Sequence, residues 1–257
     1  MDPESRRVFG QTHADIRFEW GPIGAAALAS SCDVLVVVDI FSFTTAVDVA
    51  TSRGGRIYPT AHRDQSAEDL ARNVGARLAV DRRSISTADP YSLWPRSLME
   101  IPSGTRLVLP SPNGSAISSL AVRDGCHVLA GCFRNRTAVA EAAGTKLGAT
   151  VAVVASGERW PDGSLRPALE DLLGAGAIID VLIGKGRTAS PEAIAASSAF
   201  KQVASELQAV LSRTASSIEL VALGFDDDVA IAGLIDVSTA VPTLKDGAFQ
   251  NLELREG

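Results

Sequence analysis

The feature that most constrains the fold of this chain is a series of short apolar runs, rich in β-branched residues, that are each followed by a loop and a stretch of helical character. The four clearest runs are residues 34–39, 106–110, 127–131 and 150–155. Continuous apolar runs bounded by turn residues are typical of strands that are buried on both faces of a sheet. Their alternation with helical segments predicts an α/β fold: a mostly parallel sheet with helices on both faces, arranged as one unit or as two similar α/β subdomains.

The remaining periodicity predicts the covering helices and two further strands. Residues 14–20 alternate apolar and charged side chains, which predicts a half-buried strand, and residues 218–223 are interpreted as another strand. A helix of small residues is expected at 21–31. The other expected helices lie at 44–52, 65–72, 114–122, 136–147, 167–183, 191–212 and 227–234.

The length of 257 residues suits a single α/β unit over 1–257. The least regular stretch, 81–104, has three prolines and a tryptophan without a periodic partner. We interpret this stretch as a crossover between two subdomains or as a lid, so any subdivision of the unit is expected there.

The charge balance bears on the kind of partner. The chain has 24 Lys and Arg against 30 Asp and Glu, a net charge of −6, and only 5% of its residues are aromatic. Without a basic cluster or many aromatic stacking platforms, nucleic acid is not expected as a partner. No apolar run approaches the ~18–20 residues of a membrane-spanning helix, so no membrane partner is expected. The acidic run at 226–228 is interpreted as charge at a helix N-terminus.

The three cysteines, Cys32, Cys126 and Cys132, form no C-x-x-C pair and have mostly apolar neighbours. That pattern is typical of free thiols in a reducing compartment, and we therefore expect a cytoplasmic protein. Because the chain also has only three histidines, a metal site would use oxygen ligands and a hard cation such as Mg²⁺.

Polar residues directly follow each of the four apolar runs. Asp39 ends the first run, the loop 111–115 follows the second, Arg134 and Asn135 follow the third, and Glu158 and Arg159 follow the fourth. Ligands of parallel α/β sheets bind at the carboxyl ends of the strands. We therefore expect these polar residues to meet at one rim of the sheet.

Asp39 ends an apolar strand, and a carboxylate there must be paired, hydrated or bound to a metal. One interpretation is a cap or an Asx turn for the helix that follows. The other is a Mg²⁺ ligand or a nucleophile that accepts a phosphoryl group. Phe41 stands where a haloacid-dehalogenase-type phosphatase would have its general acid, which weakens the nucleophile interpretation.

The loops after the second and third runs contain candidate anion-binding groups. Small residues in the loop 111–115 would let backbone N–H groups point at an anion, although Asn-Gly is also a common plain turn. Arg134 is either an anion clamp or a solvated side chain, and Asn135 is a candidate helix cap.

The most informative stretch is 157–176, GERWPDGSLRPALEDLLGAG, which leads into a helix that is apolar nearly all round. Such a helix is buried, yet Glu170 and Asp171 lie in its opening turns, where burial requires a partner for each carboxylate. Adjacent carboxylates point about 100° apart and do not chelate as an i, i+4 pair would. We expect one to bind metal while the other caps the helix or pairs with Arg159 or Arg166; alternatively, both are exposed at a helix start.

Several stretches in one order resemble a known family. The chain resembles the 2-phosphosulfolactate phosphatase (ComB-like) family in VVVDIFSFTTAV at 36–47, SPNGS at 111–115, CFRNRTAVA at 132–140, GERWPDGSLRPALEDLLGAGAIID at 157–180 and Val241-Pro242. The resemblance runs from about residue 34 to residue 242. It implies an α/β fold and a Mg²⁺-dependent phosphatase of 2-hydroxy acid phosphates that acts in coenzyme M biosynthesis.

The chain departs from the family pattern at two places. Ser42 stands where the family usually has the arginine of Asp-Val-Leu-Arg-Ala, and the family's Gly-Asn-Ser-Pro is present only as Asp-Pro-Tyr-Ser at 89–92. A lost arginine removes a charge-assisted partner of a substrate anion, worth ~1.5–3 kcal/mol. We therefore expect an ester less anionic than phosphosulfolactate to be preferred, unless Arg134, Arg159 or Arg166 substitutes.

The resulting hypothesis is a Mg²⁺-dependent phosphatase that hydrolyses a small anionic phosphate monoester, 2-phosphosulfolactate or a related 2-hydroxy acid phosphate, as a homodimer. The alternative is a non-catalytic ComB-like protein that binds a small anionic ligand. The expected catalytic residues are Asp39, Glu158 and Asp171, and the expected metal ligands are Asp39, Glu170 and Asp171. The expected substrate-binding residues are Ser111, Asn113, Gly114, Ser115, Arg134, Asn135 and Arg159.

Overall fold

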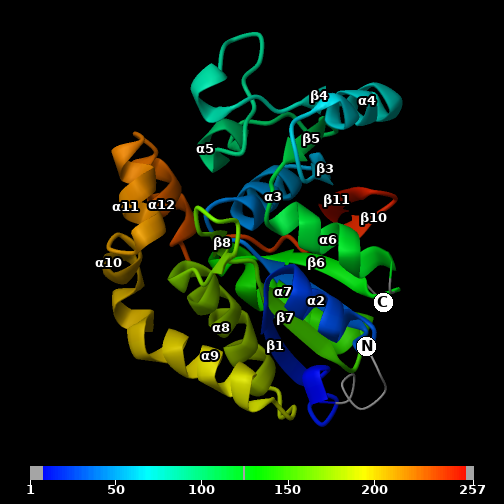
Figure 1. Ribbon diagram of the computed structural model, residues 1–257, viewed down its shortest axis with the longest axis vertical. Helices are drawn as coiled ribbons and strands as arrows, with labels where there is room; N and C mark the ends of the chain where they lie inside the picture. The colour runs from blue at the N-terminus through cyan, green and yellow to red at the C-terminus, as the bar shows by residue number, and fades with distance from the viewer. Residues whose placement is uncertain (1–7, 124, 253–257) are drawn as a thin grey trace.

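The computed structural model describes residues 8–123 and 125–252, and its centre is a nine-stranded sheet (Figure 1). The strand order is β1-β7-β2-β6-β10-β11-β3-β5-β4. Its strands are β1 (Ile16–Trp20), β2 (Val34–Val38), β3 (Arg56–Thr60), β4 (Arg77–Leu78), β5 (Arg106–Pro110), β6 (His127–Gly131), β7 (Val151–Ala155), β10 (Pro242–Lys245) and β11 (Ala248–Asn251). Strands β8 (Glu158–Arg159) and β9 (Leu165–Arg166) form a separate hairpin. The predicted α/β class with a mostly parallel sheet is confirmed.

A C-terminal hairpin joins two groups of parallel strands into this one sheet. Strands β1, β7, β2 and β6 are parallel to one another, and so are β3, β5 and β4. Between the groups, β10 pairs antiparallel with β6, and β11 pairs antiparallel with β3. Since β10 and β11 are themselves antiparallel, the two groups run in opposite senses. The sheet is continuous, and a division into two subdomains is not confirmed.

Eleven α-helices of the described residues surround the sheet. They are α2 (Gly21–Ala29), α3 (Phe43–Ser52), α4 (Gln65–Val74), α5 (Pro95–Leu98), α6 (Gly114–Arg123), α7 (Arg136–Glu141), α8 (Leu169–Ile183), α9 (Pro191–Val203), α10 (Leu207–Leu211), α11 (Ala215–Ala222) and α12 (Asp226–Ala232). The predicted helices are present with shifted ends. The expected helix 191–212 is interrupted by a 3₁₀ turn at Ala204–Glu206, and the expected helix 136–147 widens into a π-helix at Ala142–Leu147.

The strand predicted at 218–223 is wrong, because this segment belongs to α11. Thr214 caps that helix, since its side chain accepts a hydrogen bond from the N–H of Ser217. The local cap therefore outweighs the β-branched composition, and Ile218 and Val221 stay exposed on the helix surface.

Strand β2 shows why the sheet is covered on both faces. Val34, Val36 and Val38 pack in one cluster with residues of α7, α8 and α9. Leu35 and Val37 point to the other side, into a cluster with residues of α2, α3 and α6. A strand buried on both sides needs a continuous apolar run, and Asp39 directly follows that run.

The irregular stretch 81–104 connects β4 to its neighbour β5, at the top of Figure 1. It contains a 3₁₀ helix at Arg82–Ser84 and α5, and it links two parallel strands of one sheet. A subdivision of the 1–257 unit near this stretch stays a prediction.

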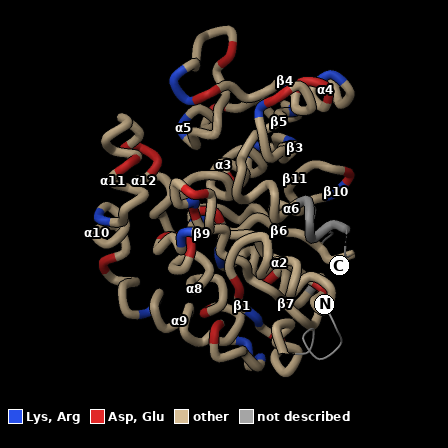
Figure 2. The backbone as a smooth tube through the Cα atoms, in the orientation of Figure 1, with Lys and Arg blue, Asp and Glu red and all other residues tan. Residues whose placement is uncertain are grey.

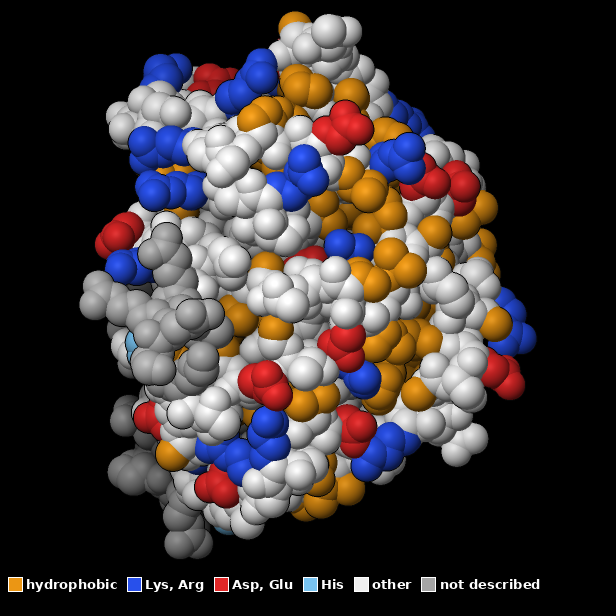
Figure 3. Space-filling view, turned by 180° about the vertical axis from the view of Figure 1, so that it is seen from behind, with side chains coloured by type: hydrophobic (Ala, Val, Ile, Leu, Met, Phe, Trp, Pro, Cys, Tyr) orange, Lys and Arg blue, Asp and Glu red, His pale blue; other side chains and the backbone are white. Residues whose placement is uncertain are grey.

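The described surface and helices bear on the predicted partners. None of the described helices is long and apolar enough to cross a membrane. On the face seen in Figure 3, Lys and Arg side chains are interspersed with acidic and hydrophobic ones. None of the three cysteines forms a disulfide, and the Sγ atoms of Cys32 and Cys126 lie 3.7 Å apart.

Candidate active site

Asp39 is a buried carboxylate at the carboxyl end of β2, and the backbone binds both of its oxygens. Oδ1 accepts a hydrogen bond from the N–H of Phe43 at 3.2 Å, and Oδ2 accepts one from the N–H of Gly114 at 3.0 Å. The first bond satisfies a backbone N–H in the opening turn of α3, which is the cap interaction expected from the sequence as one interpretation of Asp39. The second bond fixes the loop 111–115 against the end of β2.

Gly114 was expected to present its N–H to a substrate anion, but the anion that it binds is the protein's own carboxylate. A Cβ at this position would lie 2.4 Å from Cδ1 of Phe43 and 2.9 Å from Oδ2 of Asp39. Only a glycine therefore permits this close approach between the start of α6 and the loop before α3.

Asp171 lies in the first turn of α8 and is buried. Its Oδ1 accepts a hydrogen bond from the N–H of Ile40 at 2.7 Å, and its Oδ2 accepts one from the N–H of Gly157 at 2.9 Å. Burial does require partners for this carboxylate, as expected, but they are backbone groups rather than Arg159 or Arg166. Asp171 therefore ties together the loops that follow β2 and β7.

Glu158 and Glu170 complete a group of four carboxylates. Glu158 is half-buried on β8, and its Oε2 accepts a hydrogen bond from the side-chain amide of Asn113 at 3.0 Å. Glu170 is buried in the first turn of α8. We call Asp39, Glu158, Glu170 and Asp171 the carboxylate cluster.

The members of the carboxylate cluster act on one another electrostatically. Burial, with a smaller effect of the charge of Glu170, raises the pKa of Asp39 to about 6 against the backbone hydrogen bonds that lower it. Burial, then the charges of Asp39 and Glu170, raise the pKa of Glu158 to about 7. The same three causes hold the pKa of Asp171 well above its ordinary value. In Figure 2, segments of the tube coloured for acidic and for basic residues lie together near the label of β9.

The expectation that polar residues meet at one rim therefore holds for Asp39, Glu158 and the loop 111–115. Strands β2 and β7 are parallel neighbours, so their carboxyl ends coincide. Strand β5 belongs to the oppositely directed group, yet its loop reaches the same place through Asn113 and Gly114. Ser111 and Ser115 of this loop are buried.

The remaining residues predicted to bind substrate have partners inside the protein. Arg134 forms an ion pair with the buried Asp48, with Nε 2.8 Å from Oδ2. Asn135 is buried, and its side chain binds the N–H of Cys132 and the C=O of Ala130. The exposed Arg159 donates to the C=O of Gly163 within the β8–β9 hairpin. A role for these side chains in substrate binding stays a prediction.

Arg82 was not among the residues singled out from the sequence, yet its guanidinium lies at Ser42. Its Nη2 donates to Oγ of Ser42 at 2.5 Å, and its Nη1 lies 2.7 Å from Oδ2 of Asp228. Asp228 is fully buried, so the run 226–228 is more than a solvated helix start. Burial raises the pKa of Asp228 to about 6, although Arg82 and Ser42 lower it. No periodicity links positions 42, 82 and 228.

The donor set of the cluster suits a hard cation. Among the described residues, no three His, Cys, Asp or Glu side chains are grouped to hold a metal ion by themselves. Mg²⁺, however, is usually held by one or two carboxylates together with waters and substrate phosphate oxygens. Burial, followed by the charges of neighbouring carboxylates, raises these pKa values, and a divalent cation would favour the ionised forms. The carboxylate oxygens present therefore fit Mg²⁺.

Comparisons with known proteins point to one family. The 2-phosphosulpholactate phosphatase family model matches residues 25–247. The chain is 29% identical over 220 residues to the 2-phosphosulfolactate phosphatase of Methanothermobacter thermautotrophicus, covering 85% of this chain and 89% of the relative. It is 26% identical over 222 residues to a probable 2-phosphosulfolactate phosphatase of Thermotoga maritima, covering 85% and 92%. A probable enzyme of the same name from Deinococcus radiodurans is 24% identical over 219 residues, covering 84% and 89%.

Proposed function

The chain belongs to the 2-phosphosulpholactate phosphatase family, and from that premise we propose that it hydrolyses a small anionic phosphate monoester with Mg²⁺ as cofactor. The substrate is 2-phosphosulfolactate or a related 2-hydroxy acid phosphate. The observation that carries the proposal is the carboxylate cluster, in which four acids from three segments meet at the carboxyl ends of β2 and β7.

Glu170 is the first choice of metal ligand, because it is buried in the first turn of α8 and its charge acts on Asp39, Glu158 and Asp171. Either Asp39 or Asp171 would be the second ligand, since a carboxylate oxygen that accepts one backbone hydrogen bond keeps another lone pair. When bound, Mg²⁺ lowers the pKa of a coordinated water and neutralises phosphoryl charge. The backbone hydrogen bonds of Asp39 and Asp171 fix the directions of their carboxylates before substrate enters.

Glu158 is suited to accept the proton of the attacking water. It is the half-exposed member of the cluster, and its pKa of about 7 is matched to proton transfer near neutral pH. Asn113 holds Oε2 by a hydrogen bond, which leaves Oε1 to take the proton. As water adds to phosphorus, the ester P–O bond breaks, and the leaving alkoxide takes a proton from solvent.

Release of inorganic phosphate tests this function directly. The purified chain is incubated with 2-phosphosulfolactate and 2-phospholactate in Mg²⁺, after exhaustive EDTA treatment, and after Mg²⁺ is restored. We expect release that is lost with EDTA and recovered with Mg²⁺. Activity that survives EDTA would remove the metal from the proposal. Binding of either ester without any phosphate release would favour the alternative, a non-catalytic protein that binds a small anion.

A further inference from the structure

Arg82 lies where three distant segments of the chain meet beside the carboxylate cluster. Its guanidinium is held by Ser42, before α3, and by Asp228 in α12. It also lies over the ring of Phe225, 5.0 Å from the ring centroid. The Arg82 side chain is 17% exposed and that of Asp228 is 0% exposed, so the guanidinium is confined to one orientation.

The position of Arg82 is part of the same site rather than a remote ion pair. Ser42 lies three residues after Asp39, in the loop that leads into α3. The positive charge of Arg82 is among the influences that lower the pKa of Asp39. Arg82 is therefore close enough to act on whatever the carboxylate cluster binds.

The protein uses only part of the hydrogen-bonding capacity of the guanidinium. Nη2 donates to Oγ of Ser42, and Nη1 forms an ion pair with Oδ2 of Asp228. An arginine side chain offers five N–H donors in a fork that matches a carboxylate or sulfonate. These two contacts do not use all five donors, so the guanidinium can also bind an anionic ligand group.

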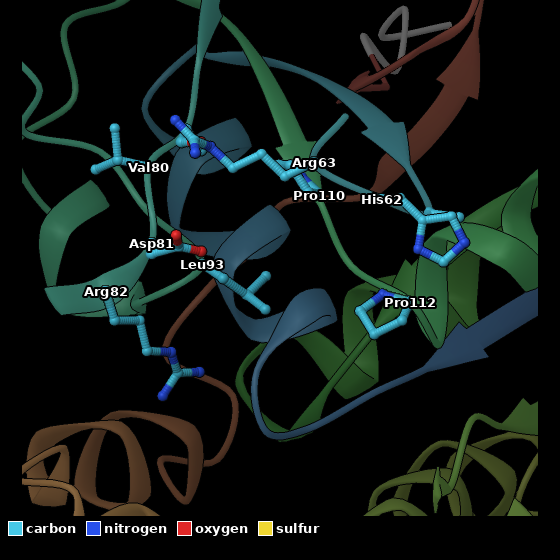
Figure 4. Close-up of a pocket in the computed structure, with 10 residues that line it drawn as sticks. His62, Arg63, Val80, Asp81, Arg82, Leu93, Pro110 and Pro112 are labelled. Atoms are coloured by element: carbon cyan, nitrogen blue, oxygen red, sulfur yellow. The ribbon is translucent and has the colours of Figure 1, made fainter. Parts of the chain in front are cut away.

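A cavity next to Arg82 provides room for such a group. It has a volume of about 360 Å³, and its lining includes His62, Arg63, Arg82 and Pro112. Pro112 precedes Asn113, which holds Glu158, so the cavity and the carboxylate cluster share the loop 111–115. Figure 4 shows Arg82 extending from the cavity wall toward the loop that leads into α3. The volume is in the range of small-ligand sites.

We propose that Arg82 binds the acid group of the phosphate monoester, a carboxylate or a sulfonate, while the carboxylate cluster acts on its phosphoryl group. Arg82 thereby determines selectivity for 2-phospho acids over uncharged esters, and Ser42 and Asp228 are its positioning residues. The inference rests on the proposed function of this site. Because Arg82 supplies a cation beside Ser42, the serine at position 42 no longer predicts a preference for a less anionic substrate.

The test compares two substrates that differ only in the acid group. In 2-phospholactate a carboxylate occupies the place that a methyl group has in isopropyl phosphate. For Arg82→Gln we expect the ratio of kcat/KM for 2-phospholactate to kcat/KM for isopropyl phosphate to fall roughly ten- to a hundredfold, whatever change the two esters share. Arg82→Lys keeps the charge but loses the fork, and it should show an intermediate loss of selectivity. Arg83→Gln, on an exposed side chain of the same short helix, should change neither value.

A second measurement separates a folding defect from lost recognition. Arg82→Gln leaves Asp228 buried without its cation, so the double variant Arg82→Gln/Asp228→Asn removes that charge as well. In this double variant the ratio of kcat/KM for 2-phospholactate to kcat/KM for isopropyl phosphate should be as low as in Arg82→Gln. Equal losses for both esters in the double variant would overturn the assignment of Arg82.

Calorimetric binding of 2-phospholactate in EDTA distinguishes this proposal from the proposed function. We expect Arg82→Gln to weaken binding by roughly ten- to a hundredfold. If the wild type binds with this Arg82 dependence but releases no phosphate, the phosphatase proposal fails and the Arg82 assignment stands. If the wild type hydrolyses 2-phospholactate and Arg82→Gln loses no selectivity, the phosphatase proposal stands and the Arg82 assignment fails. A wild type that neither binds nor hydrolyses it overturns both.

Discussion

Glu158 is half-buried, and its pKa is raised from 4.5 to about 7, first by burial and then by the charges of Asp39 and Glu170. A carboxyl group whose pKa is higher in the folded chain than in the unfolded chain stabilises the fold while it is protonated. Its contribution is fully present below 4.5 and is lost as the pH rises through about 7. The free energy of unfolding should decrease over this interval, and Glu158→Gln should remove part of the decrease. Denaturant unfolding in EDTA across the interval measures it.

Asp33 provides a control of opposite sign. Hydrogen bonds from the backbone and side chain of Thr150, and from Ala149, lower the pKa of this carboxyl below its ordinary value of 3.8. Its contribution to stability is present above 3.8 and is lost as the pH falls below it. Asp33→Asn should therefore leave the slope between 4.5 and 7 intact. An unchanged slope in Glu158→Gln would contradict the raised pKa.

The turn between β5 and α6 is an element on which the whole site depends. Gly114 opens α6 with its N–H on Asp39, and an added Cβ would meet the ring of Phe43 at 2.4 Å. Overpacking of this kind costs about 1–3 kcal/mol, or a few degrees in Tm for a chain of this size. We expect Gly114→Ala to lower Tm by that amount and to reduce kcat/KM further than the folding loss explains, since Asp39 must move.

Gly184 is the matched position for this substitution. It follows α8 with φ −58°, and a Cβ there would come no nearer than 3.4 Å to another atom. Gly184→Ala should leave Tm and activity close to the wild type. A Gly114→Ala variant that also behaves like the wild type, by thermal unfolding and phosphate release, would show that the turn tolerates displacement.

At the scale of the whole molecule, the sequence predicted the elements whose hydrophobic pattern lies within one short segment. The strands buried on both faces have continuous apolar runs, so β2, β5, β6 and β7 were predictable. Strand β3 was missed because RIYPT is short, with a charged start and a proline. The β10–β11 hairpin was missed although Asp246-Gly247, with φ 52° and 78°, is a typical hairpin turn.

The features of the sheet and of the site that the sequence did not predict depend on pairing between segments that are far apart in the chain. Residue Thr243 pairs with Leu129, and Phe249 pairs with Ile57, so the reversal of direction across the sheet has no local signal. The carboxylates at 39, 170 and 171 were predictable because an acid in an apolar segment is chemically conspicuous. The ion pairs of Arg82 with Asp228 and of Arg134 with Asp48 join separate segments, and no spacing in the sequence indicates them. The homodimer and the cytoplasmic location stay predictions.

We propose that the carboxylate cluster serves catalysis and that its buried charges lower the stability of the fold. Glu170 is the member to test, because its charge raises the pKa of Asp39, Glu158 and Asp171. Glu192, exposed in the first turn of α9, is the matched control for Glu170 in the first turn of α8.

The deciding measurement is Tm together with kcat/KM for Mg²⁺-dependent phosphate release in Glu170→Gln and Glu192→Gln. Loss of a group that hydrogen-bonds a metal ligand typically lowers activity about 10–100-fold, so loss of a ligand should lower it at least about a hundredfold. We expect Glu170→Gln to lose at least that much activity while its Tm is equal to or above that of the wild type, because a buried repulsion is relieved. Glu192→Gln should change neither. A Glu170→Gln variant that retains wild-type activity and melts at a lower temperature would contradict the account.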